Sequence, residues 1–249
     1  MKLNISTLLV LAFLFFIGSL LGWLIEVIFR RFFSANNPNR KWINPGFLIG
    51  PYIPLYGFSL MTLFVFSWIP VGFIHNLLLQ KLVLFVLMAL AVTLMEYWAG
   101  IIFIKGMNIK LWDYSNEWGN IKGIICPKFS LYWMVLSAIY YFIIHPRVIE
   151  SLYWLATHLT FSFFIGFFYG VFIIDFAYSL QVLVKIRRFA RENQIELRIE
   201  EFKDYMIRKH ETLKLRVSFM IPIKPTHHDL GDDIIEFISE HLEIGMKDK

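Results

Sequence analysis

Long runs without any charged residue dominate the first three-quarters of the chain. They cover residues 3–25, 42–80, 82–95, 129–146 and 151–174. A helix needs about 20 mainly apolar residues to cross the hydrocarbon core of a bilayer. The pattern therefore predicts an all-α, polytopic membrane protein with five transmembrane helices, at about residues 5–29, 52–69, 82–104, 129–145 and 152–184. The last segment is too long for a span alone, so we expect it to continue into the cytoplasm as one helix.

The first apolar run has an alternative interpretation, a cleavable signal peptide. The apolar part of such a peptide has about 7–15 residues and ends in small residues. Here the run is longer and continues through Gly22 and Trp23 to Glu26. We therefore expect an uncleaved first helix.

The charged residues predict two domains, a transmembrane domain at 1–184 and a cytoplasmic tail at 185–249. The tail holds 26 of the 43 charged residues, thirteen of each sign. Residues 1–184 hold eleven Lys or Arg and six Asp or Glu residues, so the net charge of +5 lies there. A nucleic-acid binder would show a basic soluble surface instead. The sequence therefore argues against nucleic acid as a partner.

The basic residues of the loops also set the orientation. Twelve of them, from Arg30 to Arg191, fall on one predicted side of the membrane, and three fall on the other. An excess of Lys and Arg marks the cytoplasmic side. We therefore predict a multi-pass protein of the plasma membrane with its N-terminus outside and its C-terminus in the cytoplasm.

Basic residues gather next to the predicted helix ends. This membrane-surface group consists of Arg30, Arg31, Lys185, Arg187 and Arg188. Such clusters attract anionic membrane lipids, and they also act simply as the positive anchor of the topology. Both interpretations remain open.

Two predicted cytoplasmic loops, at 40–57 and 111–127, are rich in Gly, Pro and aromatic residues. Their motif residues are Asn44, Gly46, Gly50 and Pro51 in the first loop, and Trp112, Asp113, Tyr114, Asn120 and Gly123 in the second. Gly and Pro disfavour a regular helix. Irregular backbone at membrane depth occurs only inside protein or along a water-filled cavity. The first loop is therefore either a re-entrant, cavity-lining element or a tight interfacial turn, and the second is expected to be a packed loop.

The two loops occupy equivalent places after helices that carry Glu26 and Glu96. Each loop then carries Asn, Gly and Pro in the same order. This order suggests two hairpins in parallel orientation, as in the parallel repeats of some transporters. Chance similarity between two membrane hairpins is the alternative.

Three acidic residues lie within the predicted spans: Glu26, Glu96 and Asp175. At 1.5 Å per residue, Glu96 lies about 13 Å and Asp175 about 15 Å from the next basic residue along the helix. Acids at such depth usually face a bundle interior or a cavity. Tyr178 shares a helix face with Asp175. Glu26 is close enough to Arg30 for an i,i+4 ion pair, which is its simpler explanation.

The three carboxylates are suited to a proton or a hard cation such as Na⁺, Ca²⁺ or Mg²⁺. We expect no metal site of the His or Cys type, because the histidines have no HxxxH spacing and Cys126 is the only cysteine. The sequence has no Gly-x-x-x-x-Gly-Lys-Ser/Thr motif and hence no ATP site.

The motifs together resemble one known family. They are Gly22-Trp23-Leu24-Ile25-Glu26, the segment 44–57, Glu96-Tyr97, Trp112-Asp113-Tyr114-Ser115, and the segment 120–124. In combination they resemble the CmpB-like membrane proteins, called ABC-transporter type IV, over about residues 10–180. The family usually has Asn-Arg-Gly-Phe-Leu where this chain has Asn44-Pro45-Gly46, so any contact of that Arg is lost or comes from Arg40 or Lys41.

The resemblance implies a transport permease, and we weigh three functions. The first is a transporter or permease subunit that moves a small solute or ion along a path lined by Glu26, Glu96, Asp175 and Tyr178 and gated by the two loops. The second is a non-catalytic membrane scaffold or regulatory subunit. The third is an enzyme acting on lipid-linked substrates through polar groups of the loops, Asn44, Asp113 and Asn120, with Lys122 or Arg40 holding a phosphate. No recognised pair of nucleophile and base supports an enzyme.

The tail is predicted to be helical. Ile195, Ile199, Phe202 and Met206 form one apolar stripe at helical spacing, and residues 232–242 form a second short amphipathic pattern. The stripe predicts docking on a partner subunit, on a second copy of the chain, or on the inner leaflet.

Overall fold

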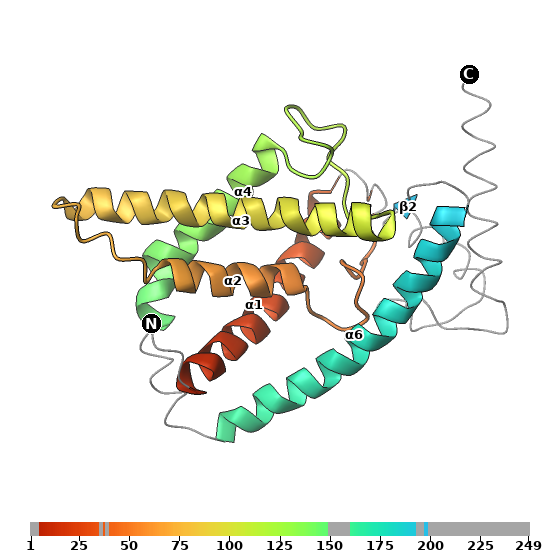
Figure 1. Ribbon diagram of the computed structural model, residues 1–249, viewed down its shortest axis with the longest axis horizontal. Helices are drawn as coiled ribbons and strands as arrows, with labels where there is room; N and C mark the ends of the chain where they lie inside the picture. The colour runs from red at the N-terminus through yellow and green to blue at the C-terminus, as the bar shows by residue number, and fades with distance from the viewer. Residues whose placement is uncertain (1–4, 35–36, 38–39, 149–159, 193–196, 199–249) are drawn as a thin grey trace.

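The computed structural model describes residues 5–34, 37, 40–148, 160–192 and 197–198. Its helices are α1 (Ile5–Phe32), α2 (Pro54–Phe66), α3 (Leu77–Met107), α4 (Pro127–Ala138) and α6 (Thr160–Glu192). A π-helical segment, η1 (Ile139–Ile144), continues α4 without a break. Figure 1 shows that successive helices alternate in direction, so both Gly/Pro-rich loops lie towards the same end of the molecule as the C-terminal end of α6.

Four helices of the described part are long and apolar enough to cross a membrane, namely Thr7–Phe32, Leu77–Met107, Pro127–Val148 and Phe163–Arg188. The second predicted span is represented by α2, which has only 13 residues. At 1.5 Å per residue α2 is about 20 Å long, short of the roughly 30 Å hydrocarbon core. Pro54 stands at its first turn and a turn at Ser67–Ile69 ends it. The predicted count of five spans is therefore not confirmed.

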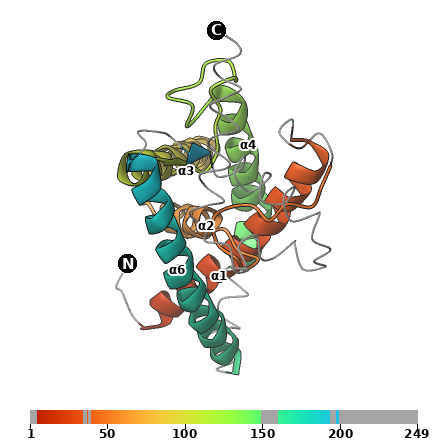
Figure 2. The ribbon, with the colours of Figure 1, turned by 90° about the vertical axis from the view of Figure 1, so that its right-hand side faces the viewer.

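The short helix α2 packs against its neighbours at very close range. Figure 2 shows it in the middle of the bundle, between α1, α3 and α4. Glycines allow this approach, because a Cβ atom on Gly22 would lie 2.1 Å from the Tyr56 ring and one on Gly57 would lie 2.3 Å from Ser19 Oγ. Small residues at helix crossings are typical of membrane proteins, where packing replaces the hydrophobic effect as the driving force.

The helix surfaces away from the bundle interior are apolar. Phe163 and Ile174 of α6 are each more than 70% exposed. The buried side includes Leu63, Met88 and Trp133, which pack into one core cluster. A water-soluble protein rarely leaves such extended apolar surface uncovered. The arrangement fits a bundle whose outer surface contacts lipid.

The beginning of the tail differs from the predicted helix. As predicted, the last apolar segment continues beyond residue 184, because α6 ends at Glu192. Strand β2 (Leu197–Arg198) then pairs in parallel with strand β1 (Ile109–Lys110) just after α3. Residues 197–198 are therefore extended rather than helical, because their backbone pairs with the segment that follows α3, and the predicted helical tail is otherwise a prediction. The apolar stripe from Ile195 to Met206, apart from 197–198, and the pattern at 232–242 lie outside the described residues.

Candidate functional site

The first acidic residue, Glu26, is held by two partners near the C-terminal end of α1. Its Oε1 accepts a hydrogen bond from Arg30 Nε at 3.0 Å, which is the i,i+4 ion pair considered from the sequence. Its Oε2 accepts one from Tyr56 Oη of α2 at 3.1 Å. Tyr56 can reach this position because Gly22 carries no side chain where the ring lies. Glu26 is therefore an anion with a cationic partner and a neutral one.

Glu96 is the most deeply buried acid of the described part, with 2% exposure. Its Oε1 accepts a hydrogen bond from Tyr114 Oη at 3.1 Å. Its Oε2 is buried and accepts no hydrogen bond from the described residues, although the Trp133 indole lies near the carboxyl group. A carboxylate oxygen normally accepts hydrogen bonds when buried. Glu96 is therefore a buried acid without a charged partner among the described residues.

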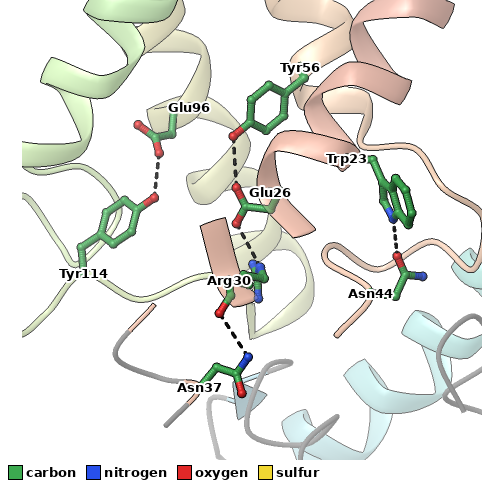
Figure 3. A network of polar contacts seen from close by, with 8 residues as sticks. All are labelled: Trp23, Glu26, Arg30, Asn37, Asn44, Tyr56, Glu96 and Tyr114. Atoms are coloured by element: carbon green, nitrogen blue, oxygen red, sulfur yellow. Dashed lines mark hydrogen bonds and ion pairs between the residues drawn. The ribbon is translucent and has the colours of Figure 1, made fainter. Parts of the chain in front are cut away.

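The two glutamates belong to one cluster. Figure 3 shows Glu96, with Tyr114 of the second loop bonded to it, beside the pair formed by Tyr56 and Glu26. Rings fix both tyrosines, because Tyr56 packs on Trp133 at 4.8 Å between centroids and Tyr114 stacks on the Phe129 ring at 4.1 Å. We call Glu26, Arg30, Tyr56, Glu96 and Tyr114 the glutamate cluster. Its two carboxyl groups and two hydroxyls are of the kinds that bind and relay protons.

Tyr114 connects this cluster to the second loop. Its backbone N–H donates to Gly123 O at 2.8 Å, which fixes the side chain over Phe129. Burial, and next the negative charge of Glu96, raise the pKa of the Tyr114 hydroxyl well above its ordinary value. The hydroxyl therefore stays neutral and acts as a donor to Glu96.

Asp175 lies in a different network. Its Oδ1 accepts hydrogen bonds from Ile49 N at 3.1 Å and Ser179 Oγ at 2.9 Å. Its Oδ2 accepts hydrogen bonds from Gly50 N at 2.8 Å and Tyr52 Oη at 2.5 Å. Four donors thus satisfy this carboxylate. Asp175 attaches the first loop to α6, and none of these contacts joins it to Glu26 or Glu96.

The first loop is also attached to α1. Trp23 Nε1 donates to Asn44 Oδ1 at 2.6 Å, and Asn44 Nδ2 donates to Leu48 O and Ile49 O at 3.2 and 2.9 Å. Gly46 takes a positive φ of 76° that L side chains rarely adopt. Leu48 is almost fully buried. The irregular backbone of the predicted loop is therefore packed inside protein, and Pro51 stands between Gly50 and Tyr52, which both donate to Asp175.

The second loop is held by its own polar side chains, whereas the aromatic packing expected from the sequence is only partial, since Trp118 is 86% exposed. Asp113 accepts hydrogen bonds from Ser115 N at 3.0 Å and from the Ser115 hydroxyl. Asn120 donates to Ser115 O at 3.0 Å and accepts from Gly123 N at 3.0 Å. Trp112 Nε1 donates to the backbone carbonyl of Ile124 at 2.8 Å. The loop therefore presents Tyr114 on a rigid support.

The proposed repeat of the two hairpins is only partly visible in these contacts. Gly46 and Gly123 both take a positive φ soon after an asparagine. Asn44 braces residues that follow it, whereas Asn120 also braces residues that precede it. The internal repeat stays a prediction.

The remaining candidate residues lie away from the glutamate cluster. Tyr178 is 41% exposed on α6, on the same helix as Asp175. The Arg31 guanidinium stacks over the Trp42 ring, 4.9 Å from its centroid. Lys185 and Arg188 are exposed at the end of α6, and Arg187 is half-buried. These positions suit a membrane surface, but no lipid contact tests them.

The sequence did not predict the tyrosine and tryptophan side chains that donate hydrogen bonds to the candidate residues. Tyr56, Tyr52 and Trp23 each donate to a residue singled out from the sequence. The available signal was that an acid buried among apolar residues requires a donor, and Tyr and Trp supply one while adding apolar surface.

In the part of the chain that the structure describes, no group of three His, Cys, Asp or Glu side chains is placed to hold a metal ion.

Apolar helices with a polar cluster inside the bundle define the chain as a multi-spanning membrane protein. A family model described as "Putative ABC-transporter type IV" matches residues 13–180. The chain belongs to this family, as the motif resemblance implied. The match includes both loops, the glutamate cluster and Asp175. No curated protein and no solved structure matches the chain.

Proposed function

We propose that this protein is a transporter or permease subunit that moves a small solute or ion past the glutamate cluster. The observation that carries the proposal is Glu96, a carboxyl group inside the apolar bundle with one oxygen that accepts no hydrogen bond from the described residues. Ionisable residues at such places are costly and usually mark a functional path. Membership of a transporter-like family supports the same function.

The two loops are proposed as the cytoplasmic gate of this path. The first is attached to α1 through Trp23 and to α6 through Asp175. The second carries Tyr114, which contacts Glu96 directly. Release of either set of contacts would free a segment at one end of the helix bundle. In this proposal Asp175 and Tyr178 act on the gate rather than on the transported species.

We further propose a plasma-membrane location with the loops and the C-terminus in the cytoplasm. The bias of basic residues towards this side supports it, and so does the common end at which the loops and the α6 end lie in Figure 1. Any ATP hydrolysis would come from a partner subunit, since the chain has no phosphate-binding loop.

Electrical recording on proteoliposomes adsorbed to a solid support tests the function. The full chain is exposed in turn to rapid jumps of amino acids, sugars, nucleosides and inorganic ions. We expect at least one class to elicit a current that Glu96→Gln abolishes. Glu117→Gln is the matched control, because Glu117 lies in the second loop and pairs with Lys128 at 2.8 Å, away from Glu96. Its current should equal that of the wild type.

Two outcomes would count against the proposal. An undiminished current in Glu96→Gln would remove the glutamate cluster from the path. Responses equal to those of empty liposomes across all classes would remove the transport function itself.

One observation favours a second candidate, a non-catalytic scaffold or regulatory subunit. Glu96 and Asp175 are each paired with a tyrosine, as expected if intramembrane acids serve as structural glue. For a scaffold, Glu96→Gln and Asp175→Asn should both lower the melting temperature of the detergent-purified chain, with no solute-dependent current in any variant.

A further inference from the structure

We propose that Glu96 is a proton-exchange site, with Glu26 as its fixed anion, and that the proton is the ion that couples to transport. This inference rests on the proposed function for its role in coupling. The described groups that face Glu96 from the packed elements are Glu26 of α1, Tyr56 of α2, Tyr114 of the second loop and the Trp133 indole of α4, and Arg30 of α1 is the partner of Glu26.

The two glutamates differ in their charge partners. Glu26 forms an ion pair with Arg30 at 3.0 Å. Glu96 has no cationic partner among the described residues, and the donors that approach it, the Tyr114 hydroxyl and the Trp133 indole, are both neutral. A lone carboxylate in an apolar interior is strongly disfavoured relative to the neutral acid. Glu96 is therefore the member of the pair that changes its protonation state.

The atoms around Glu96 favour a proton over a metal cation. Ca²⁺ takes about 6–8 oxygen ligands and Mg²⁺ about six. The described neighbours of Glu96 offer hydrogen-bond donors instead: the Tyr114 hydroxyl points its proton at Oε1, and an indole N–H is a donor only. The one open acceptor is Oε2 of Glu96 itself. One acceptor oxygen suffices for a proton and falls short of a coordination shell.

Tyr114 provides the connection to water. It belongs to the loop between α3 and α4, where its neighbour Ser115 is exposed. In the exchange step the Tyr114 hydroxyl passes its proton to Oε1 of Glu96 while its oxygen takes a proton from a hydronium ion, which becomes water, so that Glu96 gains one proton and the phenol is restored. The reverse sequence releases it. Tyr56 donates to Glu26, so this second hydroxyl keeps the fixed anion in place beside the exchanging one.

Infrared difference spectroscopy on the full chain in nanodiscs tests the site without any transport assay. The spectrum of the wild type should show a carboxylic-acid carbonyl band that grows as the pH falls, and Glu96→Gln should lose that band. Glu117→Gln is the control and should keep it. The band surviving in Glu96→Gln would overturn the proposal, provided that both variants elute as monodisperse, folded protein.

Two further variants separate proton exchange from a structural effect, because they should act in opposite directions. Glu26→Gln removes the negative neighbour and leaves Arg30, so the midpoint of the band should move to lower pH. Tyr114→Phe keeps the stacking on Phe129 but removes the hydrogen bond to the charged form of Glu96, so the midpoint should move to higher pH. Shifts of the same sign in both variants would overturn the inference.

Metal cations provide the last comparison. Adding Na⁺ or Ca²⁺ at constant pH should leave the carbonyl band unchanged, and its displacement by either ion would overturn the choice of a proton. A titrating band without any solute current would leave the proton site standing and reject the transport function. A solute current that is abolished in Glu96→Gln, without a titrating band in the wild type, would support the transport function and reject the proton site.

Discussion

Replacing Asp175 with asparagine should release the first loop from α6. Each oxygen of this carboxylate accepts one backbone amide of the loop, from Ile49 at 3.1 Å and from Gly50 at 2.8 Å, and also one hydroxyl. An asparagine side chain has a single acceptor oxygen. Whichever way its amide is oriented, one of the two backbone donors then faces an NH₂ group. The hydroxyls of Tyr52 and Ser179 can reverse and accept, but the backbone amide cannot.

The change in the free energy of opening the first loop follows from these hydrogen bonds. A buried donor left without a partner costs about 1–3 kcal/mol, and hydrogen bonds to a charged group are worth about 1 kcal/mol more than neutral ones. One lost donor and two or three weakened bonds give about 3 kcal/mol for the opening of the loop. At 1.4 kcal/mol per tenfold change, the open fraction should rise by about two orders of magnitude.

Hydrogen exchange measured by mass spectrometry in nanodiscs reads this opening directly at the amides of Ile49 and Gly50. Ser179→Ala is the matched control, because it removes a donor of α6 itself and leaves the loop contacts of Asp175 in place. Its exchange should rise by less than about tenfold. Exchange in Asp175→Asn within about twofold of the wild type would refute the role of Asp175 as the anchor of the loop.

Two more predictions concern the glutamate cluster. Gly22→Ala places a methyl group 2.1 Å from the Tyr56 ring, so it should destabilise the fold by about 1–3 kcal/mol and lower the melting temperature. Gly166→Ala is the control and should leave the melting temperature unchanged, because nothing lies within 4 Å of its Cβ. Equal melting temperatures for the two variants would contradict the tight crossing of α1 and α2. Tyr114 should remain neutral at pH 10, because burial and the charge of Glu96 raise the pKa of its hydroxyl above the ordinary value. The hydrogen bond from this hydroxyl to Glu96 is therefore fully present below about pH 10. It is lost only as the pH rises through the raised pKa. The ultraviolet difference between the wild type and Tyr114→Phe measures this, and a phenolate signal already at pH 9 would contradict it.

The hydrophobic pattern was sufficient to locate the helices, because an apolar segment in a bilayer must satisfy its backbone internally and the helix does so within one segment. The cores of α1, α3 and α6 lie where the charge-free runs predicted them. The pattern overestimated α2, because residues 67–74 are as apolar as a helix but form turns beside Pro70. An apolar segment indicates burial or contact with lipid, but its composition does not predict where a helix ends.

The sequence by itself also placed three acids within apolar segments, but of these three only Glu96 is fully buried. Only the tertiary structure decided which of them act together. Glu26 and Glu96 lie 70 residues apart, yet they are close enough to interact electrostatically, and each accepts a hydrogen bond from a tyrosine of another segment, whereas Asp175 is joined to a loop about 125 residues earlier. Such contacts depend on the rotation of each helix about its axis and on close glycine crossings. These rotations and crossings depend on the packing of all helices together, so the spacing of residues along one helix does not predict them.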